Sequence, residues 1–220
     1  MEIYGTNLTT TSKQWSGDDF VNNTAPTTLG GVKVTINGIP AFLYYVFPGQ
    51  IGCVAPDGIG TGEVNVVVTN ANGTSDSYKV TAVARSPGLL APPAFKSANK
   101  QFVTALFPDA TFVGPENLIP GALFRPAAAG ERLVLYGIGF GPTNPVIPAG
   151  RIVTGAATLS NVEVKLGDKS ATVEYAGLAG SFVGLYQFNI IVPAGVSGEV
   201  RLTVSVGGTP LVQELWIATQ

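Results

Sequence analysis

The sequence predicts an all-β protein built from two tandem sandwiches, and three observations support this prediction. Short runs alternate between apolar and polar residues, which is the pattern of a strand with one buried face. Turn dipeptides separate these runs, namely Asn37-Gly38, Asn72-Gly73 and Gly207-Gly208, and such pairs favour tight hairpins. No segment shows the sustained apolar spacing of an amphipathic helix.

The alternating runs define the strands in order along the chain. Three of them carry a largely valine face, formed by Val32, Val34 and Ile36, by Val64, Val66 and Val68, and by Val200, Leu202 and Val204. Successive side chains of a strand point to opposite faces of its sheet. Each of these faces is therefore predicted to lie inside a sandwich.

An internal repeat relates the two halves of the chain. Residues 2–8 match residues 134–140, residues 28–32 match 158–162, residues 41–45 match 171–175, and residues 50–56 match 187–193. The apolar positions keep their parity, since Ile51, Cys53 and Ala55 align with Phe188, Ile190 and Val192. A one-residue slip would turn each strand inside out, so the repeat predicts two copies of one domain with these positions facing inward.

The two copies differ at two places. Residues 131–133 lead into the first strand of the second copy, whereas the first copy has only Met1 at the matching point, so we expect its N-terminal strand to be cut short. From Tyr175 to Gln187 is 12 positions and from Tyr45 to Gln50 is 5, which gives the second copy 7 extra residues. They belong to the apolar stretch 177–186, which would either cover one end of a sandwich or contact a partner.

These matches divide the chain into a first domain at 1–84, a connector at 85–130 and a second domain at 131–220. Within the connector, residues 101–107 and 111–113 flank Pro108-Asp109-Ala110, which predicts a β-hairpin at about residues 101–113. Prolines in the rest of the connector would stiffen it. We expect the hairpin to pack on one or both domains.

The composition excludes several kinds of site. The chain has 12 Lys and Arg, 14 Asp and Glu, a net charge of −2, no histidine and one cysteine, Cys53. A Ser-His-Asp or Cys-His site, a histidine-bound zinc and an intramolecular disulfide are therefore impossible within it. The charge is unfavourable for nucleic-acid binding, and no run approaches the ~20 apolar residues of a membrane-spanning helix. We expect no cofactor and no metal, and we expect Cys53 to be an inert core residue.

The repeated motifs resemble a known family. The first copy reads Tyr-Gly-Thr-Asn-Leu at 4–8 and Gly-Gly-Val-x-Val-x-Ile-Asn-Gly at 30–38, with a later Gly-Glu-Val-x-Val-x-Val run at 62–68, and the second copy has Tyr136-Gly137-Ile138-Gly139-Phe140. These look like immunoglobulin-like domains of the IPT/TIG type. The whole chain resembles the uncharacterised C-terminal tandem domain of large secreted bacterial proteins, abundant in acidobacterial sequences. The resemblance implies a tandem immunoglobulin-like fold and an extracellular location, and it brings no catalytic residues.

The sequence favours a non-enzymatic role. Paired carboxylates could hydrolyse glycosides without histidine, but Asp18, Asp19, Glu163 and Glu174 lie beside no apolar pocket pattern. The leading hypothesis is an extracellular tandem module of a larger secreted or cell-surface protein, acting as a rigid spacer or as an adhesion unit. Its partners would be other domains of the parent polypeptide, a surface protein or a polysaccharide.

The alternative hypothesis is a carbohydrate-binding module, in which aromatic rings stack on sugar rings. The candidate contacts are Trp15, Tyr44, Phe182 and Tyr186. Trp15 lies in a polar stretch, where a large aromatic residue is either a loop anchor or an exposed stacking surface.

Overall fold

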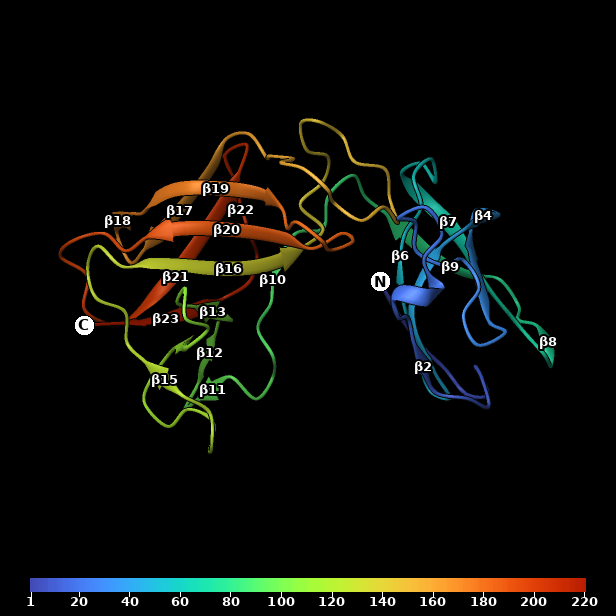
Figure 1. Cartoon of the computed structure of the whole chain (residues 1–220), viewed down its shortest axis with the longest axis horizontal. Coiled ribbons are helices and arrows are strands. Elements are labelled where there is room, and N and C mark those ends of the chain that lie inside the picture. The colour runs from blue at the N-terminus through green and yellow to red at the C-terminus, as the bar shows by residue number, and fades with distance from the viewer. The chain divides into compact units, whose positions relative to one another are not determined.

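The computed structural model describes all 220 residues and is almost entirely β, with one 3₁₀ helix at Gly17–Asp19 (η1). It divides into two compact units (Figure 1). Unit 1 comprises Met1–Ala84, Ile147–Gly155 and Gly180–Gly184, and unit 2 comprises Arg85–Val146, Ala156–Ala179 and Leu185–Gln220. Each unit is an immunoglobulin-like β-sandwich. No helix in the structure has the length and apolar character that a membrane crossing requires.

Unit 1 contains a four-stranded sheet and a five-stranded sheet. The first has the order β1 (Glu2–Tyr4), β6 (Gln50–Val54), β5 (Phe42–Phe47) and β2 (Lys13–Gln14). The second has the order β4 (Ile39–Pro40), β3 (Lys33–Ile36), β7 (Gly62–Asn70) and β8 (Gly73–Thr74), and β9 (Tyr78–Ala82) also pairs with β7. The predicted inward faces of β3 and β7 are confirmed, because Val32, Val34, Ile36, Val64, Val66 and Val68 are all buried in one core.

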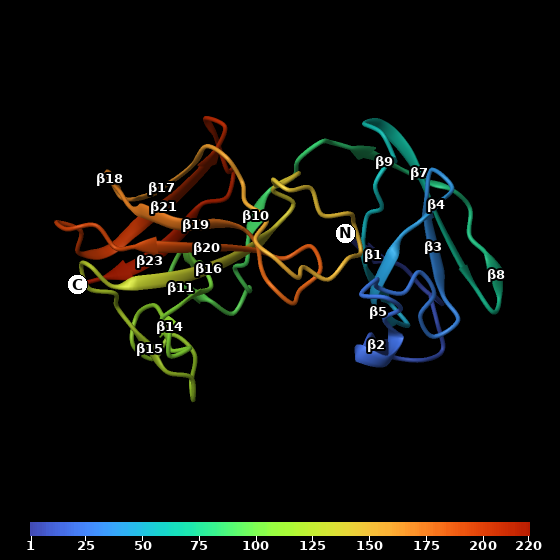
Figure 2. The same ribbon diagram turned by 45° about the horizontal axis from the view of Figure 1, so that its top comes forward.

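Unit 2 repeats this arrangement (Figure 2). One sheet contains β16 (Arg132–Ile138), β20 (Tyr186–Ile191) and β19 (Thr172–Leu178). The other contains β17 (Val162–Leu166), β18 (Lys169–Ser170), β21 (Gly198–Val206), β22 (Thr209–Pro210) and β23 (Leu215–Thr219). Phe188, Ile190 and Val192 are buried, as the repeat predicted. β1 has three residues and its counterpart β16 has seven.

The repeat extends to irregularities of the backbone. The register of β5 against β6 shifts between Leu43 and Tyr45, and that of β19 against β20 shifts at the equivalent place, between Val173 and Tyr175. Asn37-Gly38 forms the expected tight turn with φ of 49° and 79°, and Gly207-Gly208 does so with 60° and 79°. The third predicted turn lies one residue earlier, because Asn70 pairs with Gly73.

The connector residues are part of unit 2 and extend both of its sheets. Their strands are β10 (Gly88–Leu89), β11 (Lys96–Ser97), β12 (Lys100–Phe102), β13 (Ala105–Leu106), β14 (Phe112–Val113) and β15 (Phe124–Arg125). The hairpin is shorter than the range 101–113, because only Leu106 of β13 pairs with Phe112 of β14. Residues 101 and 102 pair instead with β23, in parallel. The tertiary pairing thus takes one arm of the expected hairpin to the other sheet.

Unit 1 is completed by two segments from the second half of the sequence. The amide N–H of Ala25 donates to the carbonyl oxygen of Gly150 over 2.8 Å, and that of Ile152 donates to Asn23 over 2.8 Å. The Arg151 guanidinium donates to the Asn22 carbonyl over 2.7 Å. Within these segments, Val153 and Phe182 are joined by a backbone hydrogen bond of 3.0 Å. Residues 150–152 therefore pair with residues 22–25 like a short additional strand.

Replacing Gly150 by alanine is expected to destabilise unit 1 by about 2–4 kcal/mol, because both the backbone angle and the packing oppose a side chain. Gly150 has a φ of +75°, and an added Cβ would lie 2.4 Å from Cδ1 of Phe42. Urea denaturation in a Trp216→Phe background, followed by fluorescence of Trp15 in unit 1, measures the change. The control is Gly155→Ala, since Gly155 lies in the same segment with open space around it. Equal effects of the two substitutions would contradict the proposed packing.

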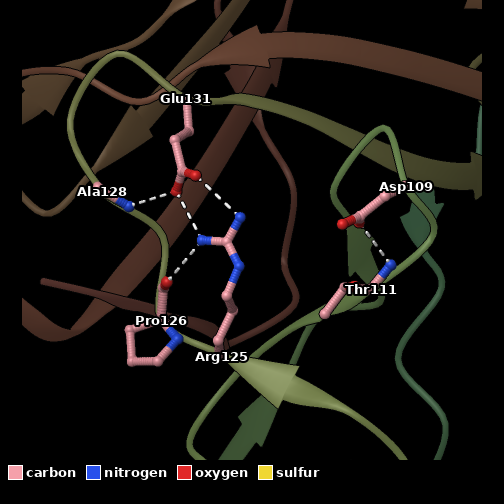
Figure 3. Close-up of polar contacts among 6 residues, drawn as sticks. All are labelled: Asp109, Thr111, Arg125, Pro126, Ala128 and Glu131. Atoms are coloured by element: carbon pink, nitrogen blue, oxygen red, sulfur yellow. Dashed lines mark hydrogen bonds and ion pairs between the residues drawn. The ribbon is translucent and has the colours of Figure 1, made fainter.

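An ion pair holds the turn that leads from β15 into β16 (Figure 3). The Arg125 guanidinium donates to both carboxylate oxygens of Glu131, over 2.9 and 2.8 Å, and the Ala128 amide donates to the same carboxylate over 2.7 Å. The guanidinium carbon also lies 3.4 Å from the ring centroid of Phe107. The hydrogen bonds from Arg125 hold the pKa of Glu131 below its usual 4.5.

Glu131→Gln is expected to destabilise unit 2 by about 1 kcal/mol at neutral pH, because it removes a charged partner of Arg125 at a partly exposed site. A depressed folded-state pKa contributes stability above the unfolded value, which is lost as pH falls through the folded value. The difference between wild type and variant should therefore shrink as pH falls below 4.5. Urea denaturation followed by Trp216 fluorescence in a Trp15→Phe background measures it. Glu163→Gln removes an exposed carboxylate that has no ion pair, and as the control it should leave stability at neutral pH close to wild type.

Candidate functional site

A row of five aromatic side chains runs in unit 1 from the loop after β2, where Trp15 and Phe20 are half-buried, to the outward side of β5, and we call it the aromatic strip. It consists of Phe20, Trp15, Tyr44, Tyr45 and Phe47. Successive ring centroids along the row are 5.1, 5.0, 5.3 and 5.0 Å apart. These are the separations at which aromatic rings attract one another. The strip is therefore a contiguous surface of rings.

The bulge in β5 explains why so many rings share this face. Leu43 and Val46 both point into the core and have no exposed surface. A regular strand would place only one outward residue between two inward ones, but the register shift places two there, Tyr44 and Tyr45. Phe47 follows on the outer side. Tyr44 and Phe47 remain 39% and 37% exposed.

Gly52 of β6 makes room for the ring of Tyr45. Gly52 and Tyr45 are paired across the two strands, and a Cβ at Gly52 would lie 2.4 Å from Cε1 of Tyr45. Glycine therefore lets the ring lie close over the sheet. At the equivalent position of unit 2, Tyr175 pairs with Asn189, and its hydroxyl donates to the carbonyl of Leu178 over 2.6 Å. In unit 2 the tyrosine hydroxyl instead lies close to Gly177 of its own strand, where an added Cβ would be 2.9 Å from it.

Trp15 is held at the strip by its own loop. Its amide donates to the Tyr44 carbonyl over 2.9 Å, and the neighbouring Gln14 amide group donates to the Tyr44 hydroxyl over 2.9 Å. After Trp15 the chain enters η1, where Asp19 accepts from Ser16 and pairs with Lys13 over 2.5 Å. The hydrogen bond from Lys13 lowers the pKa of Asp19. The loop around Trp15 is therefore tied both to β5 and to itself.

A cluster of hydrogen-bonded polar side chains lies beside Tyr45 on the same face. The Tyr45 hydroxyl donates to Glu2 over 3.2 Å, the Tyr4 hydroxyl also donates to Glu2, and the Gln50 amide donates to the Tyr4 hydroxyl over 3.2 Å. The hydrogen bond from Tyr4 lowers the pKa of Glu2, against its partial desolvation. Burial, together with the hydrogen bond to Glu2, raises the pKa of Tyr45 to about 12. The face thus combines aromatic rings with a carboxylate and amide groups.

The structure brings together two of the four candidate contacts. Trp15 packs partly against the unit 1 core and contacts Tyr44, with centroids 5.0 Å apart. Phe182 lies in the Gly180–Gly184 segment of unit 1, where it is 53% exposed and makes no ring contact. The fourth candidate is wrong: Tyr186 lies in unit 2, is 8% exposed, and its hydroxyl donates to the Gly141 carbonyl. It is a packing residue on Phe140.

The stretch 177–186 therefore divides between two roles. Leu178 and Ala179 are buried in unit 2, while residues 180–184 belong to unit 1. The strip also contains residues that the sequence analysis did not select, namely Phe20, Tyr45 and Phe47. The aromatic density of residues 42–47 was a signal for Tyr45 and Phe47, because four of these six residues are aromatic.

The cysteine and the acidic side chains complete the inventory of reactive groups. Cys53, the only cysteine, is buried in the unit 1 core, and burial raises the pKa of its thiol, which confirms it as a core residue. No group of three or more His, Cys, Asp or Glu side chains is placed to hold a metal ion. The aromatic strip offers ring surfaces next to amide and carboxylate groups.

Comparisons with known proteins do not identify the chain. No protein-family model matches it, and no curated protein sequence matches it. Among solved structures, it is similar to FdeC, an Escherichia coli adhesin, with 10% identity and a TM-score of 0.29 over 96% of this chain and 52% of that one. It is also similar to domains 4 and 5 of the S-layer protein SbsC, with 16% identity and a TM-score of 0.23 over 91% and 75%. The chain spans about half the length of the FdeC structure.

Tyr45 makes the stability of unit 1 sensitive to alkaline pH. Because the folded-state pKa of Tyr45 is raised from 10 to about 12, its contribution to the free energy of unfolding is complete below pH 10 and is lost as pH rises through 12. Wild type should therefore lose stability more steeply between these values than Tyr45→Phe does. Urea denaturation across this range measures the two slopes. Tyr78→Phe, which alters an exposed tyrosine outside the strip, is the control for removing a hydroxyl group. Identical slopes for wild type and Tyr45→Phe would contradict the placement of Tyr45.

Proposed function

We propose that this chain is a non-enzymatic, extracellular adhesion module of a larger bacterial protein, and that the aromatic strip of unit 1 is its contact surface for polysaccharide. The observation that carries the proposal is the row of five rings, each in contact with the next, that ends on the outward side of β5. An outer face of an antiparallel sheet is ordinarily polar. A contiguous aromatic surface there indicates a contact site.

The groups around the strip favour a sugar over an apolar partner. A sugar ring has C–H faces that pack on aromatic rings and hydroxyl groups that need hydrogen-bond partners. Gln14 and Gln50 supply amide groups at the strip, and Glu2 supplies a carboxylate next to Tyr45. An amide both donates and accepts, so it can serve a hydroxyl in either sense. The same mixture of rings and amides is typical of small-molecule contact sites.

The extracellular and family assignments are part of the proposal. The resemblance of both repeats to IPT/TIG-type domains of secreted bacterial proteins supports them. A purely structural role, as a spacer between other domains of the parent polypeptide, is the competing function. The connector strands that extend both sheets of unit 2 favour it, because they stabilise the fold without offering a contact surface.

Alanine substitutions in the strip should separate these functions. Wild type is expected to bind at least one polysaccharide on a glycan array, and Tyr44→Ala and Phe47→Ala should each weaken binding by about tenfold, or about 1.4 kcal/mol. Both side chains are more than a third exposed, so their loss should leave the fold intact. Trp15→Ala should weaken binding further, with folding checked by thermal denaturation because Trp15 also packs on the core.

Tyr78→Ala is the matched control, since Tyr78 is 73% exposed in unit 1 and lies outside the strip. It should bind like wild type. If wild type binds no polysaccharide, or if Tyr78→Ala loses as much affinity as Tyr44→Ala does, the adhesion proposal fails and the spacer function takes its place.

A further inference from the structure

Unit 1 has a flank, separate from the aromatic strip, where its two sheets end without a covering strand. β1 pairs only with β6, and β9 pairs only with β7. The apolar residues along this flank are incompletely buried: Ile3, Val80 and Ala82 are partly exposed, and Tyr78 is 73% exposed. Both the interior between the sheets and two strand edges are therefore accessible there.

In unit 2 the equivalent flank is closed by the connector. β12 runs parallel to β23 at the edge of one sheet, and β13 runs antiparallel to β16 at the edge of the other. The chain crosses from one sheet to the other between them. Phe102, Val103 and Ala105 on this crossing strand are at most 1% exposed. The side chains of the edge strands are shielded from solvent as a result, since Leu135 of β16 and Ile217 of β23 are each 1% exposed.

The backbone hydrogen bonds show the same difference. In unit 2 the Val103 amide donates to the carbonyl of Trp216 over 3.1 Å, and the Ala127 amide donates to that of Ala218 over 2.9 Å. Ile217 pairs with Val200 as Val80 pairs with Val64, so the counterparts of Trp216 and Ala218 in β9 are Lys79 and Thr81. Their carbonyls accept no hydrogen bond from outside their own sheet. An open strand edge of this kind is a template for another strand.

We infer that the open flank of unit 1 binds an extended peptide strand, lying parallel to β9 and crossing to β1, with the apolar pattern of residues 101–106. The internal repeat supplies the chemistry of the occupant: a Phe-Val-x-Ala segment fills this position in unit 2. A second copy pairing through β9 alone would satisfy one edge and leave the interior beside β1 open. A crossing strand serves both edges and fills the space between them, as in strand-addition complexes.

The test uses the full chain and a synthetic peptide with the sequence of residues 98–107. Hydrogen exchange measured by mass spectrometry should show slower exchange in β9 and β1 when the peptide is present. At a peptide concentration of about ten times Kd, exchange there should slow about tenfold. A peptide with Val103→Pro lacks the amide that would donate to β9 and should give no protection.

Thr81→Pro in the chain is the matched variant. Thr81 is the counterpart of Ala218, whose carbonyl points away from the neighbouring strand of its own sheet. The carbonyl and N–H groups of one strand residue point to the same side, so proline at position 81 removes an outward N–H and spares the β7–β9 hydrogen bonds. The variant should melt like wild type, lose peptide protection and keep any polysaccharide binding, which distinguishes this inference from the proposed function. Three outcomes would overturn it: no protection in wild type, protection at β16 and β23 instead, or a concentration-dependent dimer protected at β9 without peptide.

Discussion

The burial of one face of β5 and β6 is the constraint on which the rest of unit 1 depends. Leu43, Val46 and Ile51 are fully buried, and Cys53 lies beside them in the same core. Because the side-chain period of a strand is two, this choice decides which residues face outward. Because the bulge lets both Leu43 and Val46 face inward, Tyr44, Tyr45 and Phe47 all face outward. The aromatic strip is a consequence of how the core is filled.

The same fold has acquired different surroundings in the two units. Unit 2 uses its connector to pair with the edges of both sheets, so its core residues at the flank are shielded and its strand edges are hydrogen-bonded. Unit 1 instead takes in residues 147–155 beside residues 22–25. Since the segments come from different parts of the chain, the two repeats differ in accessible surface although their strands match. The strip and the open flank belong to the unit with fewer covering segments.

Much of the fold could be predicted from the sequence, but less of the site. Alternation located the core positions such as Val34, Val66 and Ile190, because each depends on neighbours two residues away. Trp15 and Tyr44 could be selected from their residue type and setting. Tyr186 was misjudged because its burial depends on a distant part of the sequence, where the Gly141 carbonyl accepts a hydrogen bond from its hydroxyl. Tyr45 and Phe47 were missed although residues 42–47 are rich in aromatics, because strict alternation counted from Leu43 would place both inward and only the bulge turns them outward.

The sequence by itself determined the all-β class, the two copies, the inward positions and the turns at Asn37-Gly38 and Gly207-Gly208, because these follow from local periodicity and from backbone angles that glycine and asparagine adopt easily. It also excluded histidine and disulfide chemistry by composition. Only the tertiary structure decided that the connector closes the flank of unit 2, that residues 147–155 belong to unit 1, and that five rings form one row. Those outcomes depend on which distant strand edge or side chain is available as a partner, and no local pattern records that.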